Sequence, residues 1–166
     1  MSIKNKVLSV ICVVMLFTLV CQSGCAKRND ASVDIDTLRD AMLESFGDTA
    51  DMTTVDSSFE NAEELFAYAC DIDYSLVRSY FLSYSTLGNA DEIAVAQLES
   101  EDSAKLAQKA FQKHLESRKK LFRQYAPEQL KRTDNAKIFA SGNYAVLIIA
   151  DNAEEIKKVF EELTGE

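Results

Sequence analysis

The sequence predicts an α+β domain, a two-layer sandwich in which helices cover one face of a four-stranded antiparallel sheet. Two observations lead to this prediction. The chain contains two β-hairpins, each with a Gly-Asn turn, and helical apolar spacing recurs before and after them. The strands of a hairpin pair antiparallel, and an apolar sheet face must be covered. We therefore expect the two hairpins side by side, preceded by two N-terminal helices.

The two helices expected before the sheet differ in length. The first has four apolar residues on one face: Ile35, Leu38, Met42 and Phe46. Asp34 or Asp36 can cap its start, and Gly47 can end it. Residues 48–58 are rich in Thr, Ser and Asp, which favours a loop. The second helix is short and spans about residues 60–70.

The first hairpin is expected from strands over residues 77–85 and 93–98, joined by a Gly-Asn turn at residues 88–89. Aromatic and apolar residues dominate the first of these strands. A long helix follows the hairpin. Ser103 can cap it, and it ends before Pro127, the only proline in the chain.

The second hairpin pairs residues 137–140 with residues 144–150 around a Ser-Gly-Asn turn. Residues 144–150 are apolar throughout, so we expect this strand to be buried on both faces and to be the central strand. A last helix runs to about Leu163, with a capping box of Asp151 and Glu154 at its start. The order strand, turn, strand, helix thus occurs twice, either by duplication or as a common supersecondary pattern.

The first 24 residues have the parts of a bacterial export signal. Lys4 and Lys6 are basic, and residues 7–21 carry no charge. This uncharged stretch is short for a transmembrane helix, which needs about 20 residues, and is typical of a signal peptide. The following Ser23-Gly24-Cys25 resembles the lipobox of bacterial lipoproteins, although Gln22 stands where an apolar residue is usual.

This signal defines the expected organisation of the chain. Residues 1–24 are a lipoprotein signal peptide, residues 25–32 are a tether with lipid on Cys25, and residues 33–166 are a single domain. An uncleaved signal anchor, or an ordinary signal cut nearby, is the alternative. Cleavage before Cys25 would leave Cys70 as the one unmodified cysteine. We expect Cys70 to be a small buried hydrophobic residue on a helix, because the charges near it are acidic.

Three stretches of the chain share their order and spacing with a known family. They read NADEIAV at residues 89–95, FRQYAPEQ at residues 122–129, and SGNY at residues 141–144 before the apolar strand and Asp151. From residue 33 onward the chain resembles an uncharacterised family of bacterial lipoproteins, the domain-of-unknown-function family numbered 4358. The resemblance implies a lipoprotein of clostridia and their relatives, and it implies no activity.

The sequence contains no recognisable catalytic, metal or cofactor motif. His114 is the only histidine and lies in a basic stretch, so we expect it at the surface or boundary of the long helix. One histidine and one cysteine are too few for zinc. The acidic pairs within residues 48–51 and 71–73 lack the rest of a calcium loop. We therefore expect no metal, no cofactor and no enzymatic activity.

Four residues of the family stretches are candidate ligand contacts: Asp91, Glu92, Tyr125 and Tyr144. Asp91 and Glu92 are adjacent at a strand start, where neighbouring side chains point to opposite faces. This arrangement argues against a glycosidase pair facing one cleft. Edge solubility and turn formation are the alternative roles of these two carboxylates.

Charge is distributed unevenly along the mature chain. Without Lys4 and Lys6 it has 16 basic and 27 acidic residues, a formal net charge of −11, which disfavours nucleic acid as a partner. Residues 105–137 nevertheless hold ten basic and three acidic residues. Seven basic residues of the long helix form a candidate surface for an anionic partner: Lys105, Lys109, Lys113, Arg118, Lys119, Lys120 and Arg123. A solvated helix face balanced by acidic neighbours is the alternative.

The sequence favours a membrane-anchored extracytoplasmic lipoprotein that acts as a non-enzymatic binding or accessory module of the cell envelope. Its partner would be lipid headgroups, an anionic envelope polymer or an envelope protein. An envelope-acting hydrolase or transferase would instead need carboxylates or tyrosines that converge in a pocket. A structural subunit of a membrane complex should expose an apolar patch of several hundred Å².

Cys25→Ala should release the protein from the membrane fraction if Cys25 carries the lipid anchor. The measurement is the distribution of the protein between membrane and soluble fractions, with Cys70→Ala as the control that keeps the anchor. A Cys25→Ala protein that stayed fully in the membrane fraction would point to an uncleaved signal anchor instead.

Overall fold

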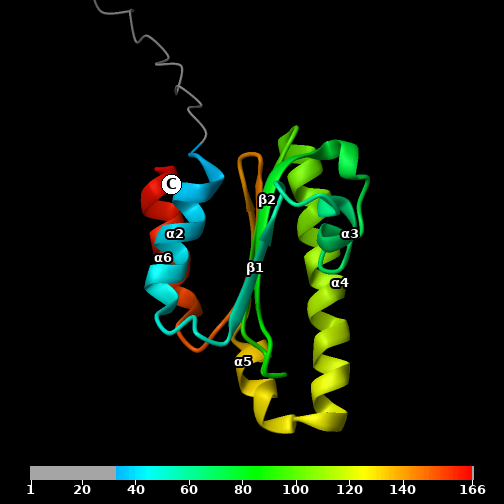
Figure 1. Cartoon of the computed structure of the whole chain (residues 1–166), viewed down its shortest axis with the longest axis vertical. Helices are drawn as coiled ribbons and strands as arrows, with labels where there is room; N and C mark the ends of the chain where they lie inside the picture. The colour runs from blue at the N-terminus through cyan, green and yellow to red at the C-terminus, as the bar shows by residue number, and fades with distance from the viewer. Residues whose placement is uncertain (1–32, 166) are drawn as a thin grey trace, which may run out of the picture. The chain divides into compact units, whose positions relative to one another are not determined.

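The computed structural model describes residues 33–165, in which helices cover both faces of one sheet (Figure 1). These residues belong to one compact unit. The expected signal peptide and tether lie outside the described residues. Within residues 33–165, no helix is both long and apolar enough to cross a membrane.

The sheet has five antiparallel strands in the order β1-β2-β3-β5-β4. They span β1 Met52–Asp56, β2 Val77–Ser85, β3 Glu92–Leu98, β4 Lys137–Ser141 and β5 Tyr144–Ile149. The two predicted hairpins are confirmed as β2–β3 and β4–β5, and they lie side by side through β3 and β5. The prediction of four strands was wrong. The central strand is β3, whereas β5 was expected there.

The additional strand, β1, lies within the segment predicted as a loop. Thr53, Thr54 and Val55 are β-branched and suit a strand. Val55 lies opposite Leu82 of β2 in the antiparallel register, and Oγ1 of Thr54 lies 2.7 Å from Oγ of Ser83. Only Val55 of the five residues is buried, because β1 is an edge strand. The strand therefore lacks the apolar alternation that would have revealed it.

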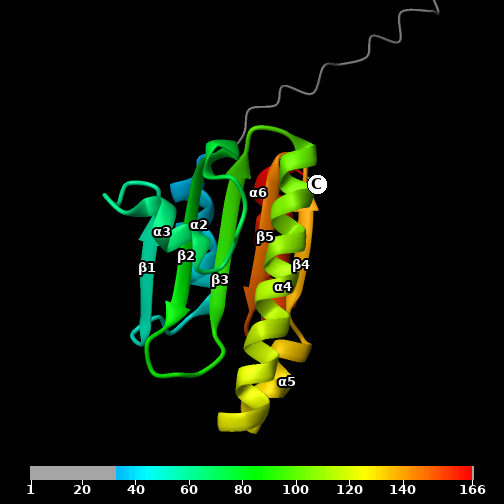
Figure 2. The same ribbon diagram turned by 90° about the vertical axis from the view of Figure 1, so that its right-hand side faces the viewer.

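The helices form two layers, one on each face of the sheet (Figures 1 and 2). Helices α2 (Ile35–Phe46) and α6 (Ala153–Thr164) share one face, and α3 (Ala62–Ala67) and α4 (Glu101–Tyr125) share the other. The prediction that helices cover one face was therefore wrong. Among residues 33–165 only α2 precedes the sheet, since α3 follows β1. A 3₁₀ turn at Pro127–Gln129 leads from α4 into the short helix α5, Leu130–Asp134.

Each helical layer has its own apolar core. Strand β3 alternates between the two cores, with Ile93 and Val95 facing α2 and α6 and with Ala94 and Ala96 facing α4. Because β3 and β5 are apolar on both faces, both faces have to be covered. The contact between α4 and the sheet is built mainly from small residues, which allow close approach: Ala94, Ala96, Ala104, Ala107, Ala110 and Ala145.

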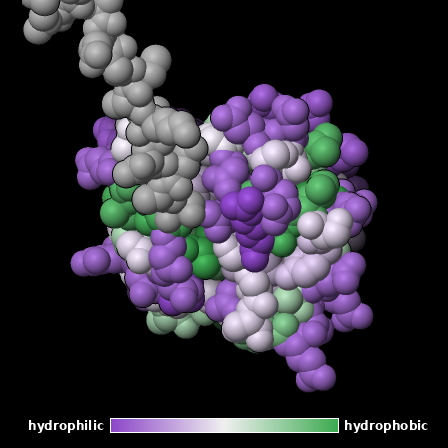
Figure 3. All heavy atoms as spheres, turned by 90° about the horizontal axis from the view of Figure 1, so that it is seen from above, coloured by the Kyte–Doolittle hydropathy of each residue, from purple (hydrophilic) through white to green (hydrophobic). Residues whose placement is uncertain are grey.

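The ends of two helices differ from the predictions. Ser100 caps α4 in place of Ser103, and its Oγ accepts a hydrogen bond of 3.2 Å from the backbone N–H of Ser103. The predicted capping box of α6 does not form. Asn152 precedes α6, and its side-chain amide donates to the carbonyl of Ser45, which joins α6 to the end of α2. Seen from above, the end of the domain where α2 begins shows hydrophobic side chains in separate groups between hydrophilic ones (Figure 3).

Cys70 is fully buried, as predicted, although it lies just beyond α3 rather than on a helix. Its thiol donates a weak hydrogen bond of 3.8 Å to the carbonyl of Ala107. Burial, with a smaller contribution from Asp71, raises the pKa of the thiol to about 12. A thiol of this kind is protonated at neutral pH and inert.

Cys70 should therefore resist maleimide labelling at mildly alkaline pH as long as the domain is folded. A chain that starts at residue 25 and carries Cys25→Ser has Cys70 as its single thiol. Mass spectrometry should find no adduct on the native protein and full labelling in concentrated guanidinium chloride. Rapid labelling of the native protein would contradict the burial of Cys70.

Candidate functional site

The candidate site is built on α4, whose inner face contacts the sheet and whose outer face carries most of the predicted cations. The helix has 25 residues and is about 37 Å long. It holds seven basic residues, and Glu116 is the only acidic residue after the first turn. Contacts around Glu92 fix its position, and contacts around Arg132 fix α5, the helix that follows it.

Glu92 is the first residue of β3, and its side chain is completely buried under α4. Oε1 of Glu92 lies 2.8 Å from Nε2 of His114. Oε2 lies 3.5 Å from Nε of Arg118, an ion-pair distance at which these two buried atoms form no hydrogen bond. A buried carboxylate is costly unless cations or donors compensate it. His114 and Arg118 are four residues apart, so one face of α4 supplies both partners.

Two tyrosines complete this cluster. Tyr84 lies opposite Glu92 in the register of β2 and β3. The ring of Tyr68 lies 5.4 Å from that of His114 and 6.1 Å from that of Tyr84. Arg118 donates long hydrogen bonds to the hydroxyl of Tyr68 and the carbonyl of Asn89. We call Tyr68, Tyr84, Glu92, His114 and Arg118 the Glu92 cluster.

The Glu92 cluster is closed to solvent at its carboxylate. The side chain of His114 is only 10% exposed, which differs from a free helix-surface residue and agrees with the boundary position that was also expected. A glutamate–histidine pair can in principle transfer a proton. Glu92, however, has no solvent-accessible surface, so no substrate atom can contact its carboxylate in this structure. We therefore assign the cluster a structural role in holding α4.

The second set of contacts surrounds Arg132 of α5. Its guanidinium lies 3.0 Å from Oδ2 of Asp91 and 2.5 Å from Oδ2 of Asp151. The side-chain oxygen of Gln129 accepts from the backbone N–H of Ala90. Burial raises the pKa of Asp91, while the hydrogen bond from Arg132 lowers the pKa of Asp151. The three stretches that carry the family resemblance therefore meet at this end of the sheet.

The four candidate ligand contacts do not come together. Asp91 contacts Arg132 and Glu92 contacts α4, so the two carboxylates have separate partners. Tyr125 is 77% exposed at the end of α4. Tyr144 lies opposite Gln97, at the far end of β3 from Glu92, and its hydroxyl donates to the carbonyl of Val33. Five residues of strand place Tyr144 about 17 Å from Glu92 along the sheet.

The seven predicted cations divide into two groups. Three already have acidic partners: Lys105 contacts Asp102, Arg118 contacts Glu92, and Lys119 contacts Asp134. The other four are exposed and form no ion pair within residues 33–165: Lys109, Lys113, Lys120 and Arg123. At 100° per residue they fall within about 80° of one side of the helix. We call these four residues the α4 strip.

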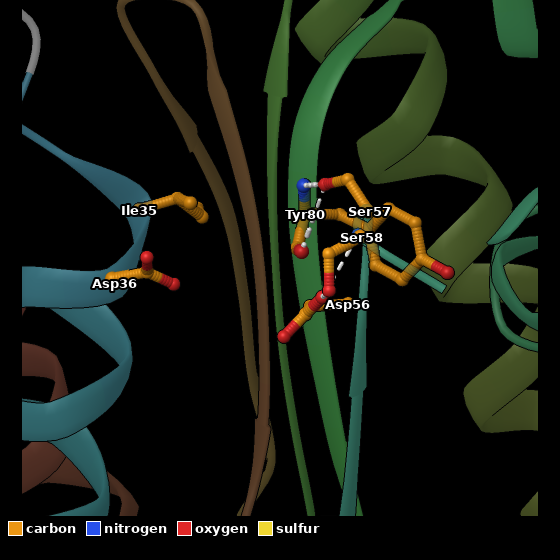
Figure 4. A pocket seen from close by; sticks show the side chains of 6 residues that line it. All are labelled: Ile35, Asp36, Asp56, Ser57, Ser58 and Tyr80. Atoms are coloured by element: carbon orange, nitrogen blue, oxygen red, sulfur yellow. Dashed lines mark hydrogen bonds between the residues drawn. The ribbon is translucent and has the colours of Figure 1, made fainter. Parts of the chain in front are cut away.

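A pocket of about 300 Å³ lies between α2 and the β1 edge of the sheet (Figure 4). Asp36 and Ile35 point toward it from α2, whereas the ring of Tyr80 points away from it. Arg39 contacts the carboxylates of Asp36 and Asp56, and Ser58 donates to Asp56, which lowers the pKa of Asp56. Both carboxylates therefore have partners. The part of the chain that the structure describes contains no group of three potential metal ligands.

Replacing the buried carboxylate should destabilise the domain far more than replacing an exposed one. Glu92→Gln leaves the mostly buried Arg118 without its counter-charge, so we expect a loss of about 3 kcal/mol in the free energy of unfolding. Glu99→Gln is the matched control, because Glu99 forms a half-exposed pair with Arg78 and such pairs contribute at most about 1 kcal/mol. Urea unfolding followed by circular dichroism measures both. Equal losses in the two variants would contradict the structural role of Glu92.

Of the comparisons with known proteins, the one with family models gives a match. The family described as "Domain of unknown function (DUF4358)" matches residues 40–150, from within α2 to the end of β5. The match includes the Glu92 cluster and all of the Arg132 contacts except Asp151. No curated protein and no solved structure gives a significant match. Because the match covers 111 of 166 residues, the chain belongs to the DUF4358 family.

Proposed function

We propose that this chain is an extracytoplasmic lipoprotein, anchored through Cys25, that acts as a non-enzymatic binding module of the cell envelope. In this proposal the α4 strip binds a partner that carries anionic groups such as phosphates. The observation that carries the proposal is the strip itself, four exposed cations without acidic partners among the described residues of an acidic protein. Such residues are free to exchange solvent and counter-ions for an anionic partner.

The charge of the two helical layers supports a defined binding face. Helix α4 has seven basic and three acidic residues, a net charge of +4. Helices α2 and α6 together have three basic and seven acidic residues, a net charge of −4. An anionic surface would therefore be attracted to the α4 side of the sheet and repelled by the opposite side.

The Glu92 cluster supports a binding role over a catalytic one. It is the place where carboxylate, histidine and tyrosines converge, as an envelope-acting enzyme would require. Its carboxylate, however, is fully buried, and its two oxygens already face His114 and Arg118. The cluster holds α4 against the sheet and leaves the opposite side of the helix free to bind.

A lipid on Cys25 would keep this domain close to the bilayer. The eight tether residues, 25–32, span at most about 29 Å when fully extended. The anchor would thereby confine the α4 strip to a thin layer at the membrane, where weak contacts become effective through high local concentration.

Lys113→Gln should weaken anion binding, while Lys158→Gln should not. Both lysines are exposed on helices, but Lys158 lies on α6, on the opposite side of the sheet. With inorganic polyphosphate as the probe and the mature chain carrying Cys25→Ser, we expect about a fivefold loss for Lys113→Gln, from about 1 kcal/mol per basic contact. Binding should also weaken as salt is added. A salt-independent affinity, or equal effects of the two substitutions, would contradict the proposed function.

A further inference from the structure

We infer that the outer edge of β1 binds an extended, basic segment of a partner protein, which adds to the sheet as a further strand. This inference goes beyond the proposed function, because it concerns an edge of the sheet and does not involve the α4 strip. Four features of β1 and its surroundings carry it: unpaired backbone groups, an edge with little protection, an adjoining pocket and a strongly acidic environment.

Two hydrogen bonds, one just beyond each end of β1, show which residues of this strand face β2. The backbone N–H of Thr86 donates to the carbonyl of Asp51, and that of Ser57 donates to the carbonyl of Tyr80. When the register of β1 and β2 is continued by one residue at each end, both bonds join residues that lie directly opposite each other. Bonding alternates along an antiparallel pair, so every second residue of β1 bonds to β2 and the residues between them face outward.

The outward-facing residues are Met52, Thr54 and Asp56. Two of their backbone groups are used in turns, since the N–H of Met52 donates to Thr49 and the carbonyl of Asp56 accepts from Phe59. The other four have no partner within residues 33–165: the carbonyl of Met52, the N–H and carbonyl of Thr54, and the N–H of Asp56. Acceptors and donors thus alternate along the edge, as pairing with another strand requires.

The β1 edge has few of the features that protect sheet edges, such as proline, lysine or a bulge. Its sequence is MTTVD, and its register with β2 has no shift. The other edge strand, β4, begins with Lys137, and Nζ of Lys157 lies 5.6 Å from the ring centroid of Phe139. Figure 2 shows β1 as the outermost strand, and no helix or strand of residues 33–165 lies beyond it. The β1 edge is therefore the more accessible of the two.

The pocket between α2 and the β1 edge can hold a side chain of the added strand (Figure 4). Alternate side chains of a strand point to the same face of the sheet, so every second residue of the segment points toward α2. Three carboxylates surround the guanidinium of Arg39 there: those of Asp36, Asp40 and Asp56, at 2.6, 3.0 and 3.6 Å. Three carboxylates and one guanidinium have a formal charge of −2. A lysine or arginine of the segment would reduce this excess.

The charge around β1 favours a basic partner over a second copy of this chain. Residues 33–73 contain twelve acidic residues, and Arg39 is their only basic residue. Pairing β1 with β1 of another copy would bring two such segments together, and like charges repel across an interface. A basic segment is attracted by the same field. Main-chain hydrogen bonds would supply affinity, and the acidic pocket would select the side chain.

A fluorescent synthetic peptide of alternating lysine and valine tests the inference. Fluorescence anisotropy measures its binding to a chain that starts at residue 25 and carries Cys25→Ser. We expect this peptide to bind, and we expect a peptide of alternating glutamate and valine not to bind. The lysine–valine peptide with N-methylated backbone amides keeps its charge but cannot donate hydrogen bonds. It should therefore bind about tenfold more weakly.

Substitutions at the two sheet edges locate the binding site. Thr54→Pro removes an outward N–H and should weaken binding of the lysine–valine peptide about fivefold, whereas Thr54→Val keeps that N–H and should not. Ala140→Pro in β4 is the matched control. The N–H of Leu98 donates to the carbonyl of Asn143, and the alternation along β5 and β4 then leaves Ala140 facing outward as well. Ala140→Pro should leave peptide binding unchanged, and urea unfolding checks that each variant is folded.

A pocket variant tests the same site without changing the backbone. Asp36→Asn should weaken binding of the lysine–valine peptide about threefold, because it removes an exposed carboxylate from the pocket. Glu155→Gln removes an exposed carboxylate from α6 and should leave the affinity unchanged.

Three results would overturn the inference. The first is no binding of the lysine–valine peptide, and the second is equal affinity of the methylated and unmethylated peptides, which would indicate attraction by charge without strand addition. The third is an equal effect of substitutions at the two sites, either of Thr54→Pro and Ala140→Pro or of Asp36→Asn and Glu155→Gln. Polyphosphate binding by the α4 strip is measured separately, so the proposed function would stand or fall independently of these results.

Discussion

Glu92 places a carboxylate inside the core at the first residue of the central strand, and α4 has to compensate it. His114 and Arg118 do so from one face of the helix, at 2.8 Å and 3.5 Å from the two carboxylate oxygens. The small residues of the α4 contact allow the helix to approach the sheet closely enough for this pairing. The position and rotation of α4 therefore depend on a charged contact whose loss would leave buried charge uncompensated.

This contact divides the basic residues of α4 into two functional groups. Arg118 pairs with the buried Glu92. The four residues of the α4 strip lie instead on the outer side of the helix. The Arg132 contacts hold α5 in place, because Arg132 pairs with Asp91 just before β3 and with Asp151 just after β5. A helix fixed on one side and cationic on the other suits binding to an extended anionic surface. A catalytic site would require the opposite arrangement, in which a substrate can reach the carboxylate and the histidine.

Much of the fold could be predicted from the sequence because apolar periodicity and turn residues are local signals. Strand β2 was predicted with the bounds that the structure shows, and both hairpins were found. Helix α2 ends before Gly47 as predicted, and of its two candidate caps Asp34 is the one that forms. Strand β1 was missed because an edge strand buries only Val55. The covering of both faces was missed as well. The apolar run of β5 predicted burial on two sides, but an antiparallel sheet was assumed to need helices on only one.

The candidate site was less predictable, because its contacts join residues far apart in sequence. The cationic surface of α4 was predicted with seven residues, of which four are exposed and form no ion pair within residues 33–165, whereas the pairing of Glu92 with His114 was not predicted. One signal was available: β3 is apolar on both sides, so a carboxylate at its start would be buried and would need a cation or a hydrogen-bond donor. The only histidine of the chain was a candidate for that role. The sequence could not show that Tyr144 and Glu92 lie far apart. Only the strand register does so, because it pairs Tyr144 of β5 with Gln97, at the other end of β3 from Glu92.

The central claim is that the outer side of α4 is free to bind an anionic partner because its inner side is held by Glu92. Charge reversal on α4 tests this claim most directly, with the binding of inorganic polyphosphate compared between Lys120→Glu on the α4 strip and Lys158→Glu on α6. The account predicts a loss of affinity for Lys120→Glu and no loss for Lys158→Glu. Equal losses for the two substitutions, or an unchanged affinity of Lys120→Glu, would contradict it.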